Sequence, residues 1–188
     1  MKFFVTLMAL LWIVSAPLAA QAPLQLTPEE QALMESAYAG ELAEVKHLVS
    51  QGTAVDVVDP DNRTPMMFAA FNGHTPVVGY LLEKGAQVDT KDINGRTALM
   101  YASSGPFGET VKLLLTKGAE IDVQGTLEGF TALMTAAAEG QVEIVRILLD
   151  RGADRSLEDV DGDTALSFAR QKGHSEVVAL LENPSPRE

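Results

Sequence analysis

Side chains that commonly perform chemistry are few in this sequence, and they do not form a recognisable site. There is no cysteine, which excludes disulfides, thiolate metal ligands and a cysteine nucleophile. The three histidines are His47, His74 and His174. A zinc site needs three or four converging ligands, and His47 has only Ser50 and Gln51 at the positions that would share its helix face. We therefore predict no metal site at His47.

An acidic stretch, Glu158 to Asp163, looks like the start of a calcium-binding loop. An EF-hand loop needs a bidentate glutamate at its twelfth position, where this sequence has Arg170. A hairpin turn with Gly162 near its tip is the simpler interpretation. The sequence also lacks a nucleophile elbow, a phosphate-binding glycine loop and a zinc-protease motif. We therefore expect neither enzymatic activity nor a cofactor.

The chain is strongly acidic, with 14 basic and 26 acidic residues and a formal net charge of −12. It contains no run of lysine or arginine. Nucleic acids and anionic membrane surfaces are bound through basic patches, so the sequence excludes both as partners. Its 188 residues fit one domain.

An internal repeat predicts how the chain is divided into the structural units that position these side chains. Threonines recur 33, 34 and 33 residues apart, at Thr64, Thr97, Thr131 and Thr164. Glycines recur at almost the same spacing, at Gly52, Gly85, Gly118 and Gly152. A fixed period near 33 residues predicts one small unit stacked several times. At helix-packing distances His74 and His174 would lie roughly 30 Å apart, so they cannot share a metal ion.

The most regular unit reads DPDNRTPMMFAAFNGHTPVVGYLLEKGA over residues 59–86. It resembles the ankyrin repeat, whose pattern is Asp-x-x-Gly-x-Thr-Pro-Leu-His-x-Ala-Ala followed by Gly-His, Val-Val, Leu-Leu and Gly-Ala. The resemblance extends over roughly residues 27–182. It implies an all-α repeat solenoid of about five units including caps, in which helix-turn-helix pairs are joined by β-hairpin loops.

The period divides the chain into an export segment, five units and a tail. In the first unit, Thr27-Pro28-Glu29-Glu30 is typical of a helix start, and we expect helices over about 28–38 and 41–50. The predicted boundaries are a signal peptide at 1–22, an N-terminal capping repeat at 23–58, repeats at 59–91, 92–124 and 125–157, a C-terminal capping repeat at 158–183 and a disordered tail at 184–188.

Residues 1–22 have the composition of a secretory signal. Lys2 gives a basic start, and a 12-residue apolar run follows from Phe3 to Val14. Small residues then precede a cleavage site that the sequence leaves ambiguous. The apolar run is short for a membrane span of about 20 residues, so we expect no stable membrane insertion once the signal is removed. A cysteine-free exported chain fits a bacterial periplasm, with secretion from the cell as the alternative.

Two places depart from the period. Residues 104–108 read Ser-Gly-Pro-Phe-Gly where neighbouring units have Asn-Gly-His or Glu-Gly-Gln, so we expect a remodelled turn that presents Phe107 outward. One extra residue falls within 124–130, which predicts a longer hairpin tip. Asn62 replaces the usual glycine of a tip, and we expect it to hold a positive φ.

Methionines replace the family's usual histidine after Thr-Pro-Leu, at Met67, Met100 and Met134. Thioethers can bind copper, but stacked positions lie about 10 Å apart, too far for one ion. We expect these methionines to pack in the core instead.

The resemblance implies that a protein partner binds the concave surface formed by hairpin tips and inner helices. Binding hot spots favour aromatic side chains and arginine. The predicted contact residues are Arg63, Phe71, Ile93, Arg96, Leu127 and Phe130. Packing of one tip on the next is the structural alternative for Ile93 and Phe130, and a solvated charge is the alternative for the arginines.

These observations predict a non-enzymatic, monomeric module that is exported to the periplasm and binds a protein of unknown identity. One alternative is a secreted effector that binds a host protein. A metal-binding envelope protein is the other. The family also has exported members linked to peroxide protection or toxin neutralisation, and the residues do not choose between these processes.

Overall fold

The computed structural model describes residues 26–182, so the predicted signal peptide and tail lie outside the described residues. Within that range the chain forms ten helices and no strand. They are α1 (Pro28–Ala39), α2 (Leu42–Ser50), α3 (Pro65–Phe71), α4 (Thr75–Glu83), α5 (Ala98–Ser103), α6 (Gly108–Thr116), α7 (Ala132–Ala138), α8 (Val142–Asp150), α9 (Ala165–Lys172) and α10 (Ser175–Glu182).

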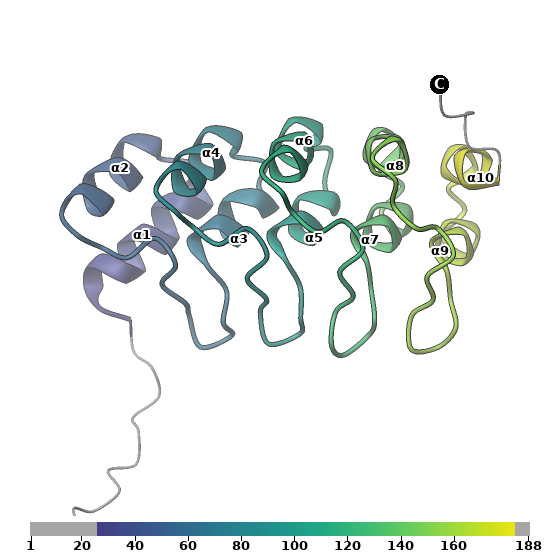
Figure 1. Ribbon diagram of the computed structural model, residues 1–188, viewed down its shortest axis with the longest axis horizontal. Coiled ribbons are helices and arrows are strands. Elements are labelled where there is room, and N and C mark those ends of the chain that lie inside the picture. The colour runs from purple at the N-terminus through teal and green to yellow at the C-terminus, as the bar shows by residue number, and fades with distance from the viewer. Residues whose placement is uncertain (1–25, 183–188) are drawn as a thin grey trace, which may run out of the picture.

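The helices stack in two rows (Figure 1). The inner helices α1, α3, α5, α7 and α9 form one row, and the outer helices α2, α4, α6, α8 and α10 form the other. Long loops project beyond the inner row, one between each helix pair and the next. The all-α solenoid is therefore confirmed. Its projecting loops are reverse turns, and none of them within residues 26–182 contains a regular strand.

Threonines begin the inner helices, as expected. Thr27 and Glu30 form a reciprocal capping box in which each side chain accepts the other residue's backbone N–H, at 3.2 and 2.8 Å. The hydroxyls of Thr64 and Thr131 accept the N–H groups of the third helical residues at 3.3 and 3.2 Å. Such caps satisfy donors that the helix itself cannot, which makes short inner helices stable.

Alanines allow the inner helices to pack closely. Ala69, Ala70, Ala102, Ala136 and Ala137 are completely buried between neighbouring units. Outer helices close the core with branched side chains that are likewise fully buried, among them Val78, Val111, Leu114, Val145 and Leu148. Each unit therefore completes the core of the next, so the stack depends on neighbour contacts.

The methionines pack as the sequence predicts. Met67, Met100 and Met134 are at most 3% exposed. The sulfurs of Met67 and Met134 each lie 3.4 Å from the backbone nitrogen of the threonine that caps the same helix. These two thioethers therefore interact with their own helix starts.

Aromatic rings seal the turns between inner and outer helices. The His174 Nε2–H donates to the carbonyl of Ala138 at 3.0 Å, and His74 does the same to Tyr38 at 2.9 Å. Each ring covers a left-handed glycine of the preceding unit, Gly140 and Gly40 respectively. The histidines therefore have structural roles in the stack, through hydrogen bonds to turn backbone.

Phe107 takes the same place, so the expectation that it points outward is wrong. Its ring lies against Gly73 of the preceding unit, as the ring of His74 lies against Gly40. The side chain is half-buried. The remodelled turn confirms the other expectation, because α5 ends at Ser103 and Pro106 occupies the turn. A hydrophobic ring thus replaces a hydrogen-bonding ring at this one junction.

Candidate binding surface

The hairpin tips are rigid because an aspartate organises the turn in each of three units. The Asp92 Oδ1 accepts the backbone N–H groups of Asn94 and Arg96 at 2.9 and 2.7 Å, and Asp59 and Asp159 make equivalent bonds. The following turn needs a positive φ, which glycine adopts without strain. Asn62 holds this position at φ 59° in the second unit, which confirms the expectation from its residue type.

Backbone hydrogen bonds also join each tip to the next. They run from Ile93 N–H to Asp61 O at 3.0 Å, from Thr126 N–H to Asn94 O at 2.8 Å and from Val160 N–H to Glu128 O at 3.1 Å. The four tips are therefore held at a fixed spacing. Side chains that project from them act as one surface.

One aliphatic side chain projects from every tip. We call Pro60, Ile93, Leu127 and Val160 the tip row. Ile93, Leu127 and Val160 are 57%, 65% and 67% exposed, and Pro60 is exposed as well. Ile93 and Leu127 were predicted contacts, whereas Val160 was not. Val160 occupies the slot of Ile93 in the repeat, which was the available signal.

The two predicted contact arginines differ in what they bind. Arg63 pairs with its own tip, at 2.7 Å to Asp59 and 3.1 Å to Asp61, and its guanidinium lies over the ring of Phe68. Arg96 instead reaches the next tip and lies 3.2 Å from Glu128. Arg96 is therefore part of a contact between the tips of the third and fourth units, which carry Ile93 and Leu127.

Tyr101 explains the difference. It occupies the slot of Phe68, and its hydroxyl donates to Asp92 Oδ2 at 2.7 Å. The Asp92 oxygen that would bind Arg96 is thereby occupied, which leaves the guanidinium to reach Glu128. Burial, together with the hydrogen bond to Asp92, raises the pKa of Tyr101 to about 12.

Aromatic side chains lie on the inner helices of the first three units. Tyr38 on α1 and Phe71 on α3 are 51% and 45% exposed. Tyr38 meets Phe68 edge to face, and Phe71 meets Tyr101 in the same way, both at 6.2 Å between ring centroids. We call these four residues the aromatic face. Phe71 was predicted, and Tyr38 was missed although it lies 33 residues earlier in the same slot.

Phe130 has mainly a packing role. It is half-buried and meets Phe168 on α9 edge to face, with ring centroids 4.9 Å apart. It also borders a notch of about 70 Å³ between the tips of the third and fourth units. The other lining residues are Asn94, Arg96, Gly125, Leu127 and Glu128. The extra residue within 124–130 therefore lies where a small recess opens beside the tip row.

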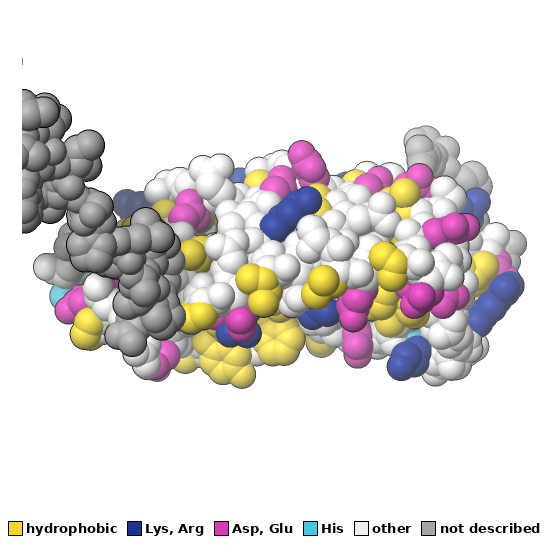
Figure 2. Space-filling view, turned by 90° about the horizontal axis from the view of Figure 1, so that it is seen from below, with side chains coloured by type: hydrophobic (Ala, Val, Ile, Leu, Met, Phe, Trp, Pro, Cys, Tyr) yellow, Lys and Arg dark blue, Asp and Glu magenta, His cyan; other side chains and the backbone are white. Residues whose placement is uncertain are grey.

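Seen from the side of the tips, hydrophobic side chains follow one another along the length of the molecule, with acidic side chains among them (Figure 2). Large exposed apolar side chains in the described part of the chain are Tyr38, Phe71, Ile93, Leu127 and Val160. All five lie on tips or inner helices, and none lies on an outer helix. The two rows of helices thus present surfaces of different character.

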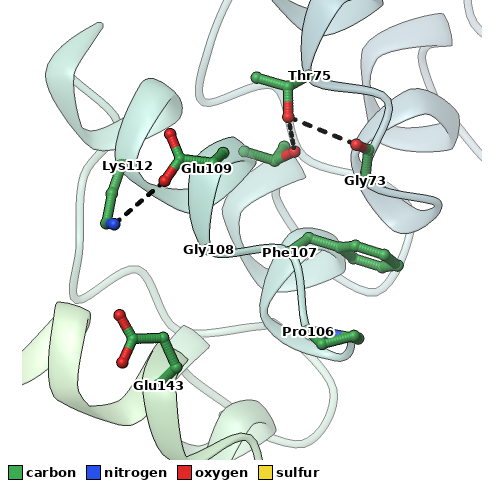
Figure 3. A pocket seen from close by; sticks show the side chains of 9 residues that line it. Gly73, Thr75, Pro106, Phe107, Gly108, Glu109, Lys112 and Glu143 are labelled. Atoms are coloured by element: carbon green, nitrogen blue, oxygen red, sulfur yellow. Dashed lines mark hydrogen bonds and ion pairs between the residues drawn. The ribbon is translucent and has the colours of Figure 1, made fainter.

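A second hollow, of about 360 Å³, lies at the other end of the helix pairs beside the remodelled turn (Figure 3). Gly108 at the start of α6 is one of its lining residues. Its walls carry Phe107 and the charged residues Glu109, Lys112 and Glu143, with Lys112 3.2 Å from Glu109. No nucleophile, base and oxyanion donor are brought together among these lining residues.

The described residues give no sign of a metal centre or a membrane span. Over residues 26–182, no three His, Cys, Asp or Glu side chains are grouped so that they could hold a metal ion. None of the helices in that range is long and apolar enough to cross a membrane.

A family model described as ankyrin repeats, in three copies, matches residues 33–125 and 104–186. The chain belongs to the ankyrin-repeat family. The match spans most of the sequence and agrees with the stacked helix pairs. Ankyrin repeats generally mediate protein–protein interaction and are typically not enzymes. No curated protein matches the sequence.

Proposed function

We propose that this ankyrin-repeat protein is a non-enzymatic module, exported to the periplasm of a bacterium, that binds another protein through its tip row and aromatic face. The single observation that carries the binding proposal is the one-sided placement of exposed apolar side chains. Exposed apolar patches that persist on a folded protein mark interaction surfaces. The proposal assigns direct contacts to Phe71, Ile93, Leu127 and Val160.

The tip row and the aromatic face are suited to binding because they are already ordered before a partner binds. Tip-to-tip hydrogen bonds and the Arg96–Glu128 contact fix the tips relative to one another. A surface that is already ordered loses little conformational entropy on association. Aromatic rings that pack edge to face are also held in place, and aromatic residues are common among binding hot spots.

Site-specific photo-crosslinking tests the binding surface. A photoreactive amino acid placed at Leu127 or Phe71 should give a discrete cross-link to a partner protein in intact cells. The same residue at Glu83, exposed at the end of an outer helix, is the matched control and should give none. Equal cross-linking from Glu83 and Leu127, or none from either tip or inner helix, would contradict the proposal.

The export proposal has a separate test, because it depends on residues 1–22 alone. Cell fractionation should place the protein in the periplasm, and N-terminal sequencing should find that the apolar run has been removed. Deletion of residues 2–20 should leave the protein in the cytoplasm. Recovery of an uncleaved protein from the cytoplasm of wild-type cells would contradict export without affecting the binding surface.

A further inference from the structure

We propose that the tip row binds a basic, helical segment of the partner protein, which places one apolar side chain on each tip and cationic side chains beside them. The inference rests on the proposed binding function and specifies the chemistry of the partner. Three features of the tips lead to it: their spacing, their occupied backbone donors and their charge.

The spacing of the tip row matches a heptad pattern. Successive tips belong to stacked helix pairs, which lie about 10 Å apart. A helix advances 1.5 Å per residue, so side chains seven residues apart lie roughly 10.5 Å apart on one face. A segment with apolar residues at every seventh position would therefore meet Ile93, Leu127 and Val160 in turn. Side chains on one face of an extended strand recur at about 6.7 Å and would lose this register.

Strand addition is also disfavoured by the backbone of the tips. A peptide that adds as a strand needs free N–H and C=O groups along an edge. The N–H groups of Ile93, Thr126 and Val160 already bond to the preceding tip. Polyproline segments, for their part, dock between aromatic rings, whereas the tip row is aliphatic. A helix that binds through side chains alone suits the available surface.

The charge of the tips selects a basic segment. The four tip segments, residues 59–63, 91–96, 126–130 and 158–163, contain eight carboxylates and three cationic side chains. Two of those cations, Arg63 and Arg96, are already paired with tip carboxylates. The last tip has four carboxylates and no cation, and Asp161 there is exposed. Complementary charges accelerate association and fix register, so the cationic end of the segment belongs over the last tip.

The notch beside Phe130 supplies an anchoring point for this segment. It opens between the tips of the third and fourth units, directly beside Leu127, and the Arg96–Glu128 pair forms part of its wall. Buried apolar anchors in such recesses contribute much of the affinity of an interface. The apolar side chain placed over Leu127 should therefore matter more than those over Ile93 and Val160.

Binding of designed peptides to the purified protein tests the inference. The probe is a 24-residue helical peptide with leucine at every seventh position, lysine beside each leucine and a fluorescent label. A control peptide has the same composition with leucines four residues apart, and a third peptide is a lysine-containing polyproline sequence. Fluorescence anisotropy should show saturable binding of the heptad peptide only, weakened as salt is raised from 50 to 300 mM because exposed charges are screened.

Variants of the protein separate the contribution of apolar contacts to peptide binding from the contribution of charge. The triple variant Ile93→Ser/Leu127→Ser/Val160→Ser should weaken binding of the heptad peptide by about tenfold or more, since it removes the apolar contacts. Glu158→Gln/Asp161→Asn should weaken it about threefold and flatten its salt dependence. Glu83→Gln, which removes an exposed charge from an outer helix, is the matched control and should have no effect. Circular dichroism of each variant checks that the fold is retained.

Several results would overturn the inference. They are tighter binding of the polyproline or four-residue-spaced peptide, heptad binding that survives the triple variant, and self-association through the tip row in light scattering. Photo-crosslinking to a partner from Leu127 without any binding of the heptad peptide would reject the basic helix and leave the proposed function standing. If neither the cross-link at Leu127 nor binding of the heptad peptide were observed, the proposed function and the basic helical partner would both be rejected.

Discussion

The glycines beneath the turn rings provide the sharpest test of how neighbouring units hold together. Gly140 has φ 68°, and a Cβ atom built on it would lie 2.6 Å from Nδ1 of His174 in the next unit. Gly173 holds the same slot in the last unit at φ 78°, with nothing within 4 Å of such an atom. Alanine at the two positions therefore meets similar backbone strain but different neighbours.

The expected costs follow from this difference. Left-handed backbone costs an alanine about 1–2 kcal/mol, partly offset by the lower entropy of its unfolded chain, so Gly173→Ala should cost about 1 kcal/mol. In Gly140→Ala the His174 ring must also move. It loses its hydrogen bond to Ala138, worth about 1 kcal/mol, and some packing. We expect a total of about 2–3 kcal/mol for Gly140→Ala.

Urea unfolding followed by circular dichroism measures these costs, and a double-mutant cycle isolates the contact. In a His174→Ala background the cost of Gly140→Ala should fall to that of Gly173→Ala, which gives a coupling free energy of about 1–2 kcal/mol. Equal costs for the two glycine variants, or no coupling to His174, would refute the proposed role of the ring.

Two further predictions concern buried polar groups. Unfolded tyrosine loses its proton near pH 10 and folded Tyr101 near 12, so the free energy of unfolding should fall between those values. After allowance for its partial exposure we expect a loss of about 1 kcal/mol, which pH-dependent urea unfolding should detect and Tyr101→Phe should abolish. Thr97→Val should leave stability unchanged or raised, because its buried hydroxyl has no hydrogen-bond partner among the described residues. Thr131→Val, which loses a cap, should cost about 1 kcal/mol in the same urea assay, and equal effects of the two valines would contradict the cap assignment.

The sequence predicted the fold well because the signals are local and recur. A threonine that caps a helix, an asparagine at a positive φ and a pair of alanines each act within a few residues. Thr64, Asn62 and Ala69 therefore behave in the structure as their residue types indicate. Repetition of the same signals in neighbouring units then identifies the stack.

The surface was harder to predict because it depends on contacts between units. Phe107 was expected to point outward, but the bare backbone of Gly73 in the preceding unit gives its ring a place to pack. The partner of Arg96 depends on Tyr101 and on the inserted tip that carries Glu128. No single unit contains all of this information.

The degree of exposure of each contact candidate was also hard to predict. Phe130, a predicted contact, is half-buried against Phe168, whereas Val160, which was not predicted, is the most exposed large apolar side chain in the described range. Exposure in a repeat protein is decided by the slot that a residue occupies. Comparison of each residue with its equivalents one period away would have identified both Val160 and Tyr38.

Partner capture by three purified proteins tests whether the tip row binds the partner. They are the wild type, the tip-row variant Ile93→Ser/Leu127→Ser/Val160→Ser, and an outer-helix variant with serine at the exposed positions Glu83, Lys117 and Arg151. Each is immobilised at equal density and exposed to the same envelope extract. We expect the partner cross-linked at Leu127 to be retained by the wild type and the outer-helix variant and lost by the tip-row variant, with unfolding midpoints unchanged. Retention by the tip-row variant, or equal loss by both variants, would show that the tip row is not the binding surface.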